Sequence, residues 1–219
     1  MDGRAVLNER IRVSEAEVEQ IVGEIDFGPF SSPMMRAIFK QFGKEAFGRS
    51  SGCMEFEHFL IALGVRGKHC LEIGTFNGIT ACLLTQFFDR VTCVTVEYDD
   101  RCRKLRAEIA AFLGLKDRIA FIDVPNHVPE AKQITMLDRA RLNAEKKRIV
   151  DALDFDFAYS DGDHTNDTHE DFALVKRCGR VLLHEAWVLQ PSVWNLANSL
   201  PKEEVTWAQF DCLALWTRK

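Results

Sequence analysis

A short apolar run that breaks into two closely spaced glycines constrains the fold of this chain more than any other feature. The stretch His69–Thr80 reads H-C-L-E-I-G-T-F-N-G-I-T, and a helix-like pattern continues from Ile79. A buried strand, a glycine turn and a helix start, in this order, form the first strand–helix unit of a doubly wound α/β fold. Glycines let the backbone pass close to a ligand, and the free N–H groups of a helix start face it. The turn is therefore a candidate ligand site, although the same pattern also occurs in plain strand–helix packing.

The spacing of the glycines narrows the class of ligand. Gly74 and Gly78 form G-x-x-x-G, which differs from the G-x-G-x-x-G that cradles a dinucleotide pyrophosphate and so argues against an NAD-type oxidoreductase. An acidic residue, Glu72, precedes the first glycine. Glu97 lies 19 residues beyond Gly78 at the end of a β-branched run, where a carboxylate can bind both hydroxyls of a ribose. An acid at a strand end is also a common turn residue, so both interpretations stay open on these residues alone.

Periodicity and turn residues predict a helical extension over residues 1–66 and an α/β domain over residues 67–219. The predicted helices span about 14–25, 34–42, 54–63, 79–88 and 99–113, with a further charged helix within 130–151. The predicted strands span about 69–73, 91–97, 119–123, 154–160 and 180–185, followed by two terminal strands near 205–210 and 212–217. The alternation of strands and helices is typical of a parallel sheet covered on both faces.

Composition excludes several classes of function. The chain of 219 residues has a net charge of −5 and no arginine–lysine stripe, so we expect no nucleic-acid partner. It has neither an apolar run of about 18 residues nor a signal segment, so we expect a cytoplasmic protein with no membrane contact. Seven scattered cysteines without a C-x-x-C indicate reduced thiols. The sequence leaves the oligomeric state open, and a homo-oligomer is one option.

Two further polar clusters follow predicted strands. One apolar run ends in Asp161-Gly-Asp-His164, and the next ends in His184-Glu185. Ligands of open α/β sheets bind at the carboxyl ends of the strands, where both clusters would lie. Asp-Gly is also the commonest turn dipeptide, so the first cluster alone does not decide between a site and a turn.

Two of these motifs resemble a known family. The sequence E-I-G-T-F-N-G-I-T is similar to the first motif of class I S-adenosylmethionine-dependent methyltransferases that act on small molecules. The D-G-D-H segment looks like the D-G-x-H motif of the cephalosporin hydroxylase and macrolide-sugar O-methyltransferase type, and the likeness covers about residues 68–200. The resemblance implies a Rossmann-like, seven-stranded doubly wound sheet with a C-terminal antiparallel hairpin. It also implies S-adenosyl-L-methionine as the cofactor.

Carried over residue by residue, the resemblance implies a cofactor site and a catalytic site. The implied cofactor-binding residues are Glu72, Gly74, Thr75, Phe76, Asn77, Gly78, Thr80, Glu97 and Asp123. Asp123 is the implied adenine contact by its position, although this chain has Asp123-Val-Pro where the family usually has a G-[DH]-[AS] triplet. Asp161 and His164 are the implied catalytic residues, with His164 as general base because an imidazole with a pKa of about 6.5 accepts protons near neutrality.

The resemblance further implies a divalent metal bound by Asp161, His184 and Glu185. The family commonly has two acids, or an acid and an asparagine, where this chain has His184-Glu185. Oxygen ligands suit Mg²⁺, whereas an imidazole favours Mn²⁺, Fe²⁺ or Zn²⁺, and a metal-free enzyme also stays open. The expected activity is O-methylation of a small hydroxylated molecule, with or without a metal. The alternative is a catalytically inactive protein of the same fold that binds S-adenosylmethionine or a nucleoside.

Overall fold

The computed structural model describes residues 34, 37, 38, 40–43, 54–96, 99–125, 135–162, 167–186, 190–207 and 213–219. The helices are α4 (Met54–Ala62), α5 (Ile79–Leu84), α6 (Asp100–Phe112), α7 (Met136–Asp151), α8 (Thr168–Val175) and α9 (Pro191–Ser199). The strands are β1 (Gly67–Ile73), β2 (Phe88–Thr95), β3 (Ile119–Asp123), β4 (Phe157–Ser160), β5 (Arg180–His184), β6 (Val205–Trp207) and β7 (Leu213–Thr217). Residues 34, 37, 38 and 40–43 are also helical, within the predicted helix 34–42 and one residue beyond it.

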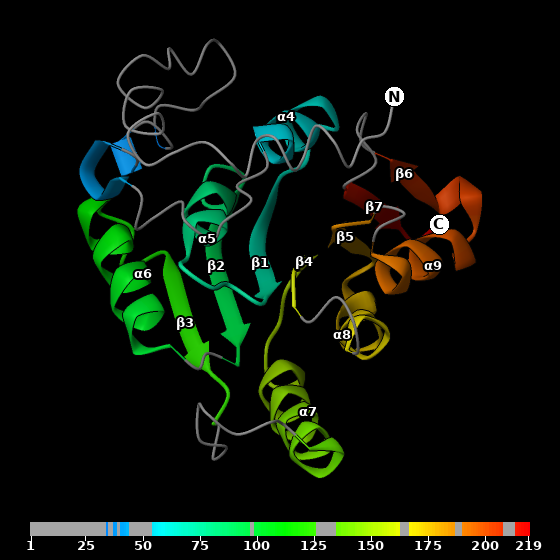
Figure 1. Ribbon diagram of the computed structural model, residues 1–219. Coiled ribbons are helices and arrows are strands. Elements are labelled where there is room, and N and C mark those ends of the chain that lie inside the picture. Colours follow the sequence, from blue (N-terminus) through cyan, green and yellow to red (C-terminus); the bar gives the residue numbers. More distant parts are fainter. Residues whose placement is uncertain are drawn as a thin grey trace, which may run out of the picture.

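One sheet of seven strands, in the order β3-β2-β1-β4-β5-β7-β6, forms the centre of the molecule (Figure 1). The first five strands are parallel, and β7 is antiparallel to both β5 and β6. The predicted Rossmann-like sheet with a C-terminal antiparallel strand is confirmed. The chain proceeds from β1 outward to β3, then returns to β4 and proceeds the other way, so the order reverses between β1 and β4. Such a switch point is where open α/β sheets bind ligands.

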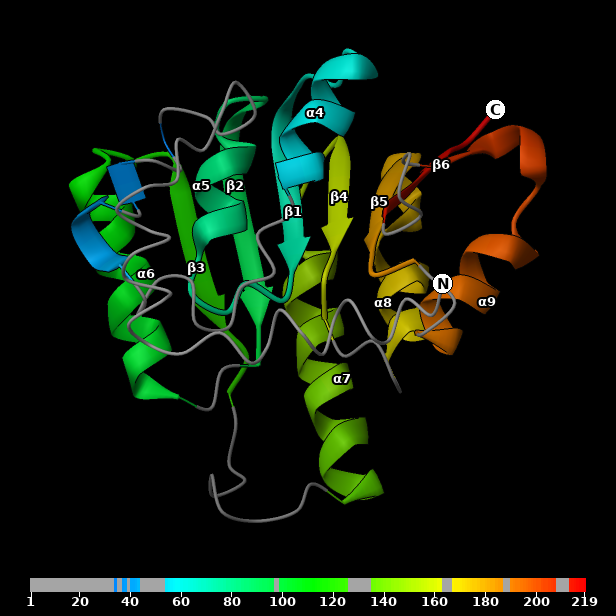
Figure 2. The same ribbon diagram turned by 45° about the horizontal axis from the view of Figure 1, so that its top comes forward.

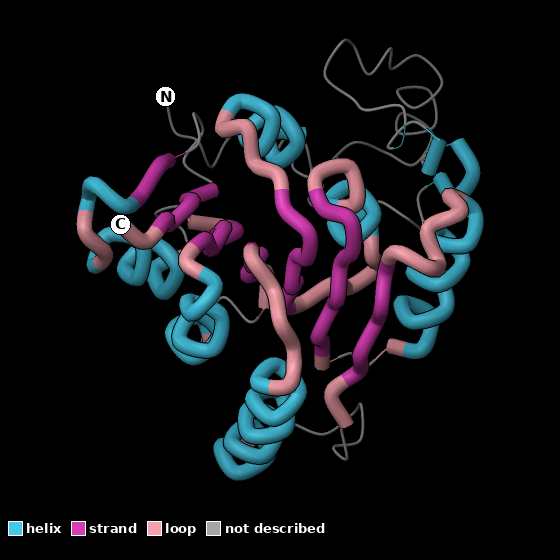
Figure 3. The backbone as a smooth tube through the Cα atoms, turned by 180° about the vertical axis from the view of Figure 1, so that it is seen from behind, coloured by secondary structure: helices cyan, strands magenta, loops and turns pink. Residues whose placement is uncertain are grey.

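Helices cover both faces of this sheet (Figure 3). One core cluster joins residues of α4, α5 and α6 to one face, and a second joins residues of α7, α8 and α9 to the other. Strand β1 is buried along its last five residues, as expected for a central parallel strand that is covered on both sides. The arrowheads of β1, β2 and β4 point the same way in Figure 2, so their carboxyl ends form one edge.

Local sequence signals set the helix boundaries. Asp99 caps α6 through a bond from the Arg101 N–H, and Thr135 and Asp138 form a reciprocal capping box at the start of α7. Gly114, with φ of +68°, follows the end of α6 at Phe112, one residue before the predicted end of this helix.

The prediction of a helix over 79–88 is wrong at its end. Helix α5 stops at Leu84, and the Thr85 hydroxyl bonds to the Cys82 carbonyl in a turn beyond it. Phe88 begins β2 instead, where it pairs with Gly67 and its ring lies 4.9 Å from that of Phe157. Its tertiary contacts therefore outweigh the helical periodicity of the sequence.

Several predictions lie outside the described residues. These are the helix at 14–25 and the turn near residues 210–211. The division at residue 66 stays a prediction; Phe56 and Leu60 of α4 belong to the same core as α5 and α6. Among the described helices, none is both long and apolar enough to span a bilayer.

Candidate active site

The glycine turn after β1 fits tightly against the loop after β4. Gly74 has φ of +79°, and a Cβ there would lie 2.2 Å from the Asp161 carbonyl oxygen and 2.9 Å from the Gly162 Cα. The Asp161 N–H donates to the Ile73 carbonyl at 2.8 Å, and the Gly74 N–H donates to the Val94 carbonyl at 3.0 Å. The ends of β1, β2 and β4 therefore converge at the switch point, and only glycine leaves room for that approach.

Most polar side chains of the turn point into the protein. Glu72 is completely buried, and Thr75 and Asn77 are 6% and 3% exposed. The Thr75 hydroxyl donates to Glu72 Oε2 at 2.5 Å, whereas no described residue hydrogen-bonds to Glu72 Oε1. Burial raises the pKa of Glu72 to about 8, while hydrogen bonds with Cys93 and Thr75 oppose that rise. Glu72 therefore keeps its proton near neutral pH, and its hydrogen bond with Thr75 stabilises the turn from the buried side.

The remaining residues of the turn are more accessible. Gly74, Phe76 and Thr80 are each partly exposed, and Phe76 has a positive φ of 45°. Gly78 caps α5 with φ of +77°, and a Cβ on it would lie 2.7 Å from the Cβ of Arg106. The groups of this turn that are accessible from outside are thus backbone atoms and the partly exposed side chains, not the buried acid.

Asp123, the predicted adenine contact, is engaged in an ion pair. Arg106 Nη2 lies 2.6 Å and 2.7 Å from the two carboxylate oxygens, and Arg103 Nε lies 3.6 Å from one of them. The Arg106 guanidinium is buried and stacks on the Phe121 ring at 5.2 Å. Asp123 is nevertheless 35% exposed at the side chain, at the end of β3 beside β2. Its role toward a cofactor stays a prediction.

Asp161 and His184 meet at the ends of β4 and β5. His184 Nδ1 lies 2.5 Å from Asp161 Oδ1, and the Tyr159 hydroxyl donates to Asp161 Oδ2 at 3.3 Å. A carboxylate oxygen only accepts hydrogen bonds, so Nδ1 of His184 carries a proton. Glu185 follows with a left-handed backbone, φ of +53°, which is uncommon for a residue with a side chain. The Asp161 side chain is 23% exposed, so this pair can reach a bound molecule.

The structure thus brings together Gly74, Asp161 and His184 among the predicted site residues. Glu97 and His164 lie outside the described residues. Sequence reasoning missed Arg106 and Tyr159. A buried arginine within a charged helix has no pattern of its own, and Tyr159 reads as an ordinary member of an apolar strand.

The described residues do not fit the predicted metal centre. They contain no group of three potential ligands arranged around one point. Both Asp161 oxygens accept hydrogen bonds from protein groups, and His184 uses Nδ1 to bond to Asp161. Two of the three predicted ligands therefore bind each other.

A groove of about 650 Å³ opens elsewhere, between α7 and α8. Alanines at 140, 144 and 173 line it, together with charged side chains such as Lys147 and Asp151, which form an ion pair. Its lining includes no predicted site residue.

Comparison with known proteins gives a clear result for the fold. No protein-family model matches the chain, and no curated protein matches its sequence. Cofactor-bound Rv0187 from MTB superimposes with a TM-score of 0.59 at 16% identity, over 94% of this chain and 98% of that one. The chain has the class I methyltransferase fold. The resemblance in the sequence predicted this fold, and the prediction is confirmed.

Two further solved structures have the same fold as this chain. A methyltransferase from Geobacter sulfurreducens has a TM-score of 0.58 at 13% identity, with 95% and 99% of the chains covered. The O-methyltransferase TomG from Streptomyces achromogenes, solved in complex with SAM, has a TM-score of 0.55 at 15% identity, with 96% and 99% covered. At these identities the likeness establishes the methyltransferase fold, and the activity is argued from the site.

Proposed function

We propose that this protein is an S-adenosylmethionine-dependent methyltransferase that methylates an oxygen of a small hydroxylated molecule. The observation that carries the proposal is the contact of Gly74 with Asp161 at the switch point of the sheet. It places a side-chain-free turn, suited to a cofactor, beside a partly exposed carboxylate that is suited to an acceptor. The fold that the chain shares with cofactor-bound relatives supports the same assignment.

The residues present fit the cofactor. The Cβ position of Gly74 is occupied by the Asp161 backbone, but Gly74 itself is partly exposed, so the backbone of the turn is accessible to a bound group. We assign Phe76 and Thr80 to contacts with it because both are partly exposed in the turn. When bound, S-adenosylmethionine supplies an electrophilic methyl group on a sulfonium.

Methyl transfer is an in-line displacement, in which a carbon–sulfur bond breaks as a carbon–oxygen bond forms. The enzyme must orient the acceptor hydroxyl and remove its proton. Asp161, oriented by His184 and Tyr159, can accept a hydrogen bond from that hydroxyl. We assign His164, three residues further on, as the base that takes the proton, in keeping with the sequence motif. We route no step through a metal, because the described ligands do not fit one.

A binding and turnover experiment tests the proposal. The native protein should bind radiolabelled S-adenosylmethionine but not NAD, and should methylate a member of a panel of catechols and sugars. Asp161→Ala and His164→Ala should abolish turnover while cofactor binding persists. His169→Ala is the matched control, because His169 is an exposed histidine of α8 and its loss should change nothing.

The other outcomes are equally informative. Binding of S-adenosylmethionine with no turnover on any acceptor would favour the inactive binding protein of the same fold. Failure to bind S-adenosylmethionine would overturn the proposed function.

A further inference from the structure

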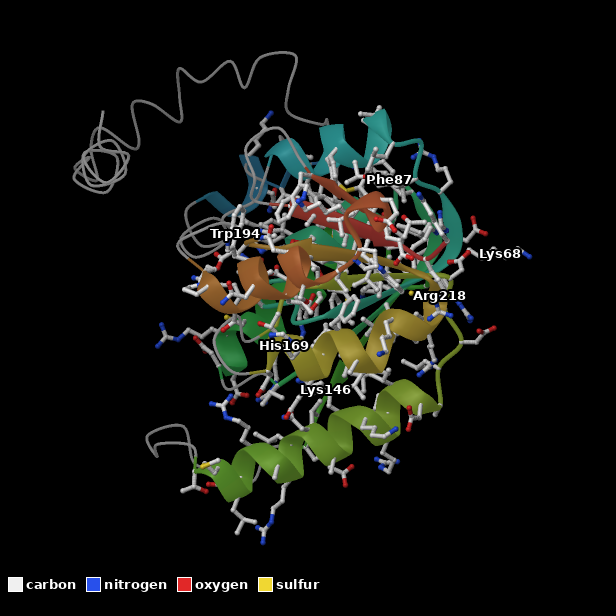
Figure 4. The ribbon with its side chains drawn as sticks, turned by 90° about the vertical axis from the view of Figure 1, so that its right-hand side faces the viewer. Lys68, Phe87, Lys146, His169, Trp194 and Arg218 are labelled. Carbon is white, nitrogen blue, oxygen red and sulfur yellow. The ribbon has the colours of Figure 1, made fainter. Side chains whose placement is uncertain are left out.

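A buried ion pair links two helices that contribute no residue to the proposed catalytic step. Lys146 of α7 and Asp171 of α8 are 5% and 1% exposed, and Lys146 Nζ lies 2.5 Å from Asp171 Oδ1. Figure 4 shows Lys146 between the two helices, with His169 at the start of α8. Two apolar side chains could fill such a space at equal or lower free energy, because burying two charges is costly. The pair therefore calls for an explanation other than stability.

The second carboxylate oxygen of Asp171 contacts the loop that carries Asp161, which suggests a role for the ion pair in positioning that loop. Asp171 Oδ2 is buried and accepts no hydrogen bond from any residue that the structure describes. It lies against the backbone of Gly162, where an added Cβ would be 2.5 Å from it. Gly162 directly follows Asp161, whose carbonyl oxygen lies against Gly74. The Asp161–Gly162 turn thus lies against both the glycine turn after β1 and the carboxylate of Asp171.

A second ion pair fixes the start of α8 to the same helix. Arg139 Nη1 lies 3.0 Å from Asp167 Oδ1, and Lys146 Nζ lies 4.0 Å from Asp167 Oδ2. The Asp171 N–H donates to the Asp167 carbonyl at 2.8 Å. Helix α7 therefore holds the first turn of α8, and with it Asp171, at two points.

We infer that Lys146 and Asp171 are positioning residues that hold the Asp161–Gly162 turn in register with Gly74 and His184; the inference rests on the proposed function of that turn. Lys146 neutralises Asp171, which allows the carboxylate to stay buried against Gly162. Burial raises the pKa of Asp171 and Lys146 lowers it, so loss of the lysine would favour a protonated or displaced Asp171. The space beside Gly162 would then open, and Asp161 would shift relative to His184.

The test compares two adjacent lysines. Lys146→Met removes the buried charge at nearly constant length, and Lys147→Met is the matched control, because Lys147 is 60% exposed and pairs with Asp151 in solvent. The readout is the Nδ1 proton of His184 in ¹⁵N-histidine NMR spectra, assigned by its loss in His184→Gln. The binding of S-adenosylhomocysteine is measured in parallel.

We expect the downfield Nδ1 signal to be lost or shifted in Lys146→Met and unchanged in Lys147→Met. Lys146→Arg keeps the positive charge, so this variant should retain the native signal. Gly162→Ala should alter the same signal although Lys146 and Asp171 are both present, since its Cβ would lie 2.5 Å from Asp171 Oδ2. An unchanged signal in folded Lys146→Met, or in Gly162→Ala, would overturn the inference.

If Lys146→Met does not fold, the double variant Lys146→Met/Asp171→Leu replaces the ion pair by two apolar side chains. Its His184 Nδ1 signal is then compared with that of Lys147→Met, and the same loss or shift is expected. Failure of the proposed function has a separate signature, because the native protein would then either not bind S-adenosylhomocysteine or show no turnover on any acceptor, whatever the histidine signal shows.

Discussion

Gly74 and Asp161 are in contact through their backbones, and the contact has no room for a side chain. A Cβ on Gly74 would lie 2.2 Å from the Asp161 carbonyl oxygen and 2.7 Å from the carbonyl carbon. The Asp161 N–H is bonded to Ile73, the residue before Gly74, so neither segment can move away freely. The glycine turn after β1 and the predicted catalytic loop are therefore one structural unit.

Gly74→Ala should lower the free energy of unfolding by more than backbone strain alone would. The matched control is Gly114→Ala, because Gly114 has a similar positive φ of +68° but nothing within 4 Å of an added Cβ. We expect Gly114→Ala to cost about 1 kcal/mol in the free energy of unfolding. Gly74→Ala should cost about 2–5 kcal/mol, since a collision is added to the strain. It should also weaken S-adenosylhomocysteine binding at least about tenfold. Urea unfolding and calorimetry measure both, and equal effects of the two substitutions would contradict the packing argument.

The sequence predicted the elements that depend on local pattern. The strand at 119–123 and the helix predicted at about 99–113 have strong local signals, and the structure has them within one residue of the predicted ends. The prediction failed at Phe88, where a helical period continues into a strand because pairing with Gly67 and packing on Phe157 decide the outcome. Such contacts join residues that are distant in sequence, so no local pattern contains them.

The candidate site was also predictable only where its residues belong to a local motif. Glycine turns and D-G motifs have recognisable spacing, which explains why Gly74 and Asp161 could be named from sequence. The pairing of Asp161 with His184 depends on β4 and β5 being neighbours, a fact of topology. Arg106 and Lys146 could not be recognised, because both belong to charged helices in which a solvent-exposed side chain is the usual case.

Arg106 should contribute to stability far more than its neighbour Arg103. Both lie on α6 near Asp123, but the Arg106 side chain is 3% exposed and that of Arg103 is 37% exposed. Arg106→Met removes two short hydrogen bonds to a carboxylate that is itself partly solvated. We expect a loss of about 1–3 kcal/mol in the free energy of unfolding, less than for a fully buried pair. Arg103→Met should cost below about 1 kcal/mol. Chemical unfolding tests the difference, and similar losses would show that the Arg106 pair is no stronger than a surface pair.

The hydrogen bonds of Asp161 lead to an expectation about metal. Its two oxygens accept from His184 and Tyr159, so Asp161 and His184 are bonded to each other and Nδ1 of His184 is not available as a metal ligand. We therefore expect methyl transfer to the acceptor found in the panel to persist in EDTA at close to its untreated rate. The control is the same assay after added Mg²⁺ or Mn²⁺. Loss of activity in EDTA with recovery on adding either ion would instead support the metal centre that the sequence resemblance implies.

Glu72 should make the stability of the protein fall as the pH rises. The groups around its carboxyl are the Thr75 hydroxyl, the Cys93 thiol, and the more distant charges of Asp161 and Arg106. Burial raises the pKa from 4.5 to about 8, so between these values the native state keeps a proton that the unfolded chain has lost. Unfolding then releases a proton, and the free energy of unfolding decreases with pH across that window. The contribution of Glu72 is fully present below pH 4.5 and is lost as the pH rises toward 8.

Glu72→Gln isolates this contribution, because glutamine has the shape of the protonated acid and does not titrate. We expect the variant to lose part of the decline in stability between about pH 5 and pH 8 that the native protein shows in urea unfolding. Glu145→Gln is the control, since Glu145 has a side chain 45% exposed on α7. A native-like pH profile in Glu72→Gln would mean that Glu72 is ionised beneath the glycine turn. A buried carboxylate anion would then lie next to the glycine turn before the positively charged sulfonium of the proposed cofactor binds.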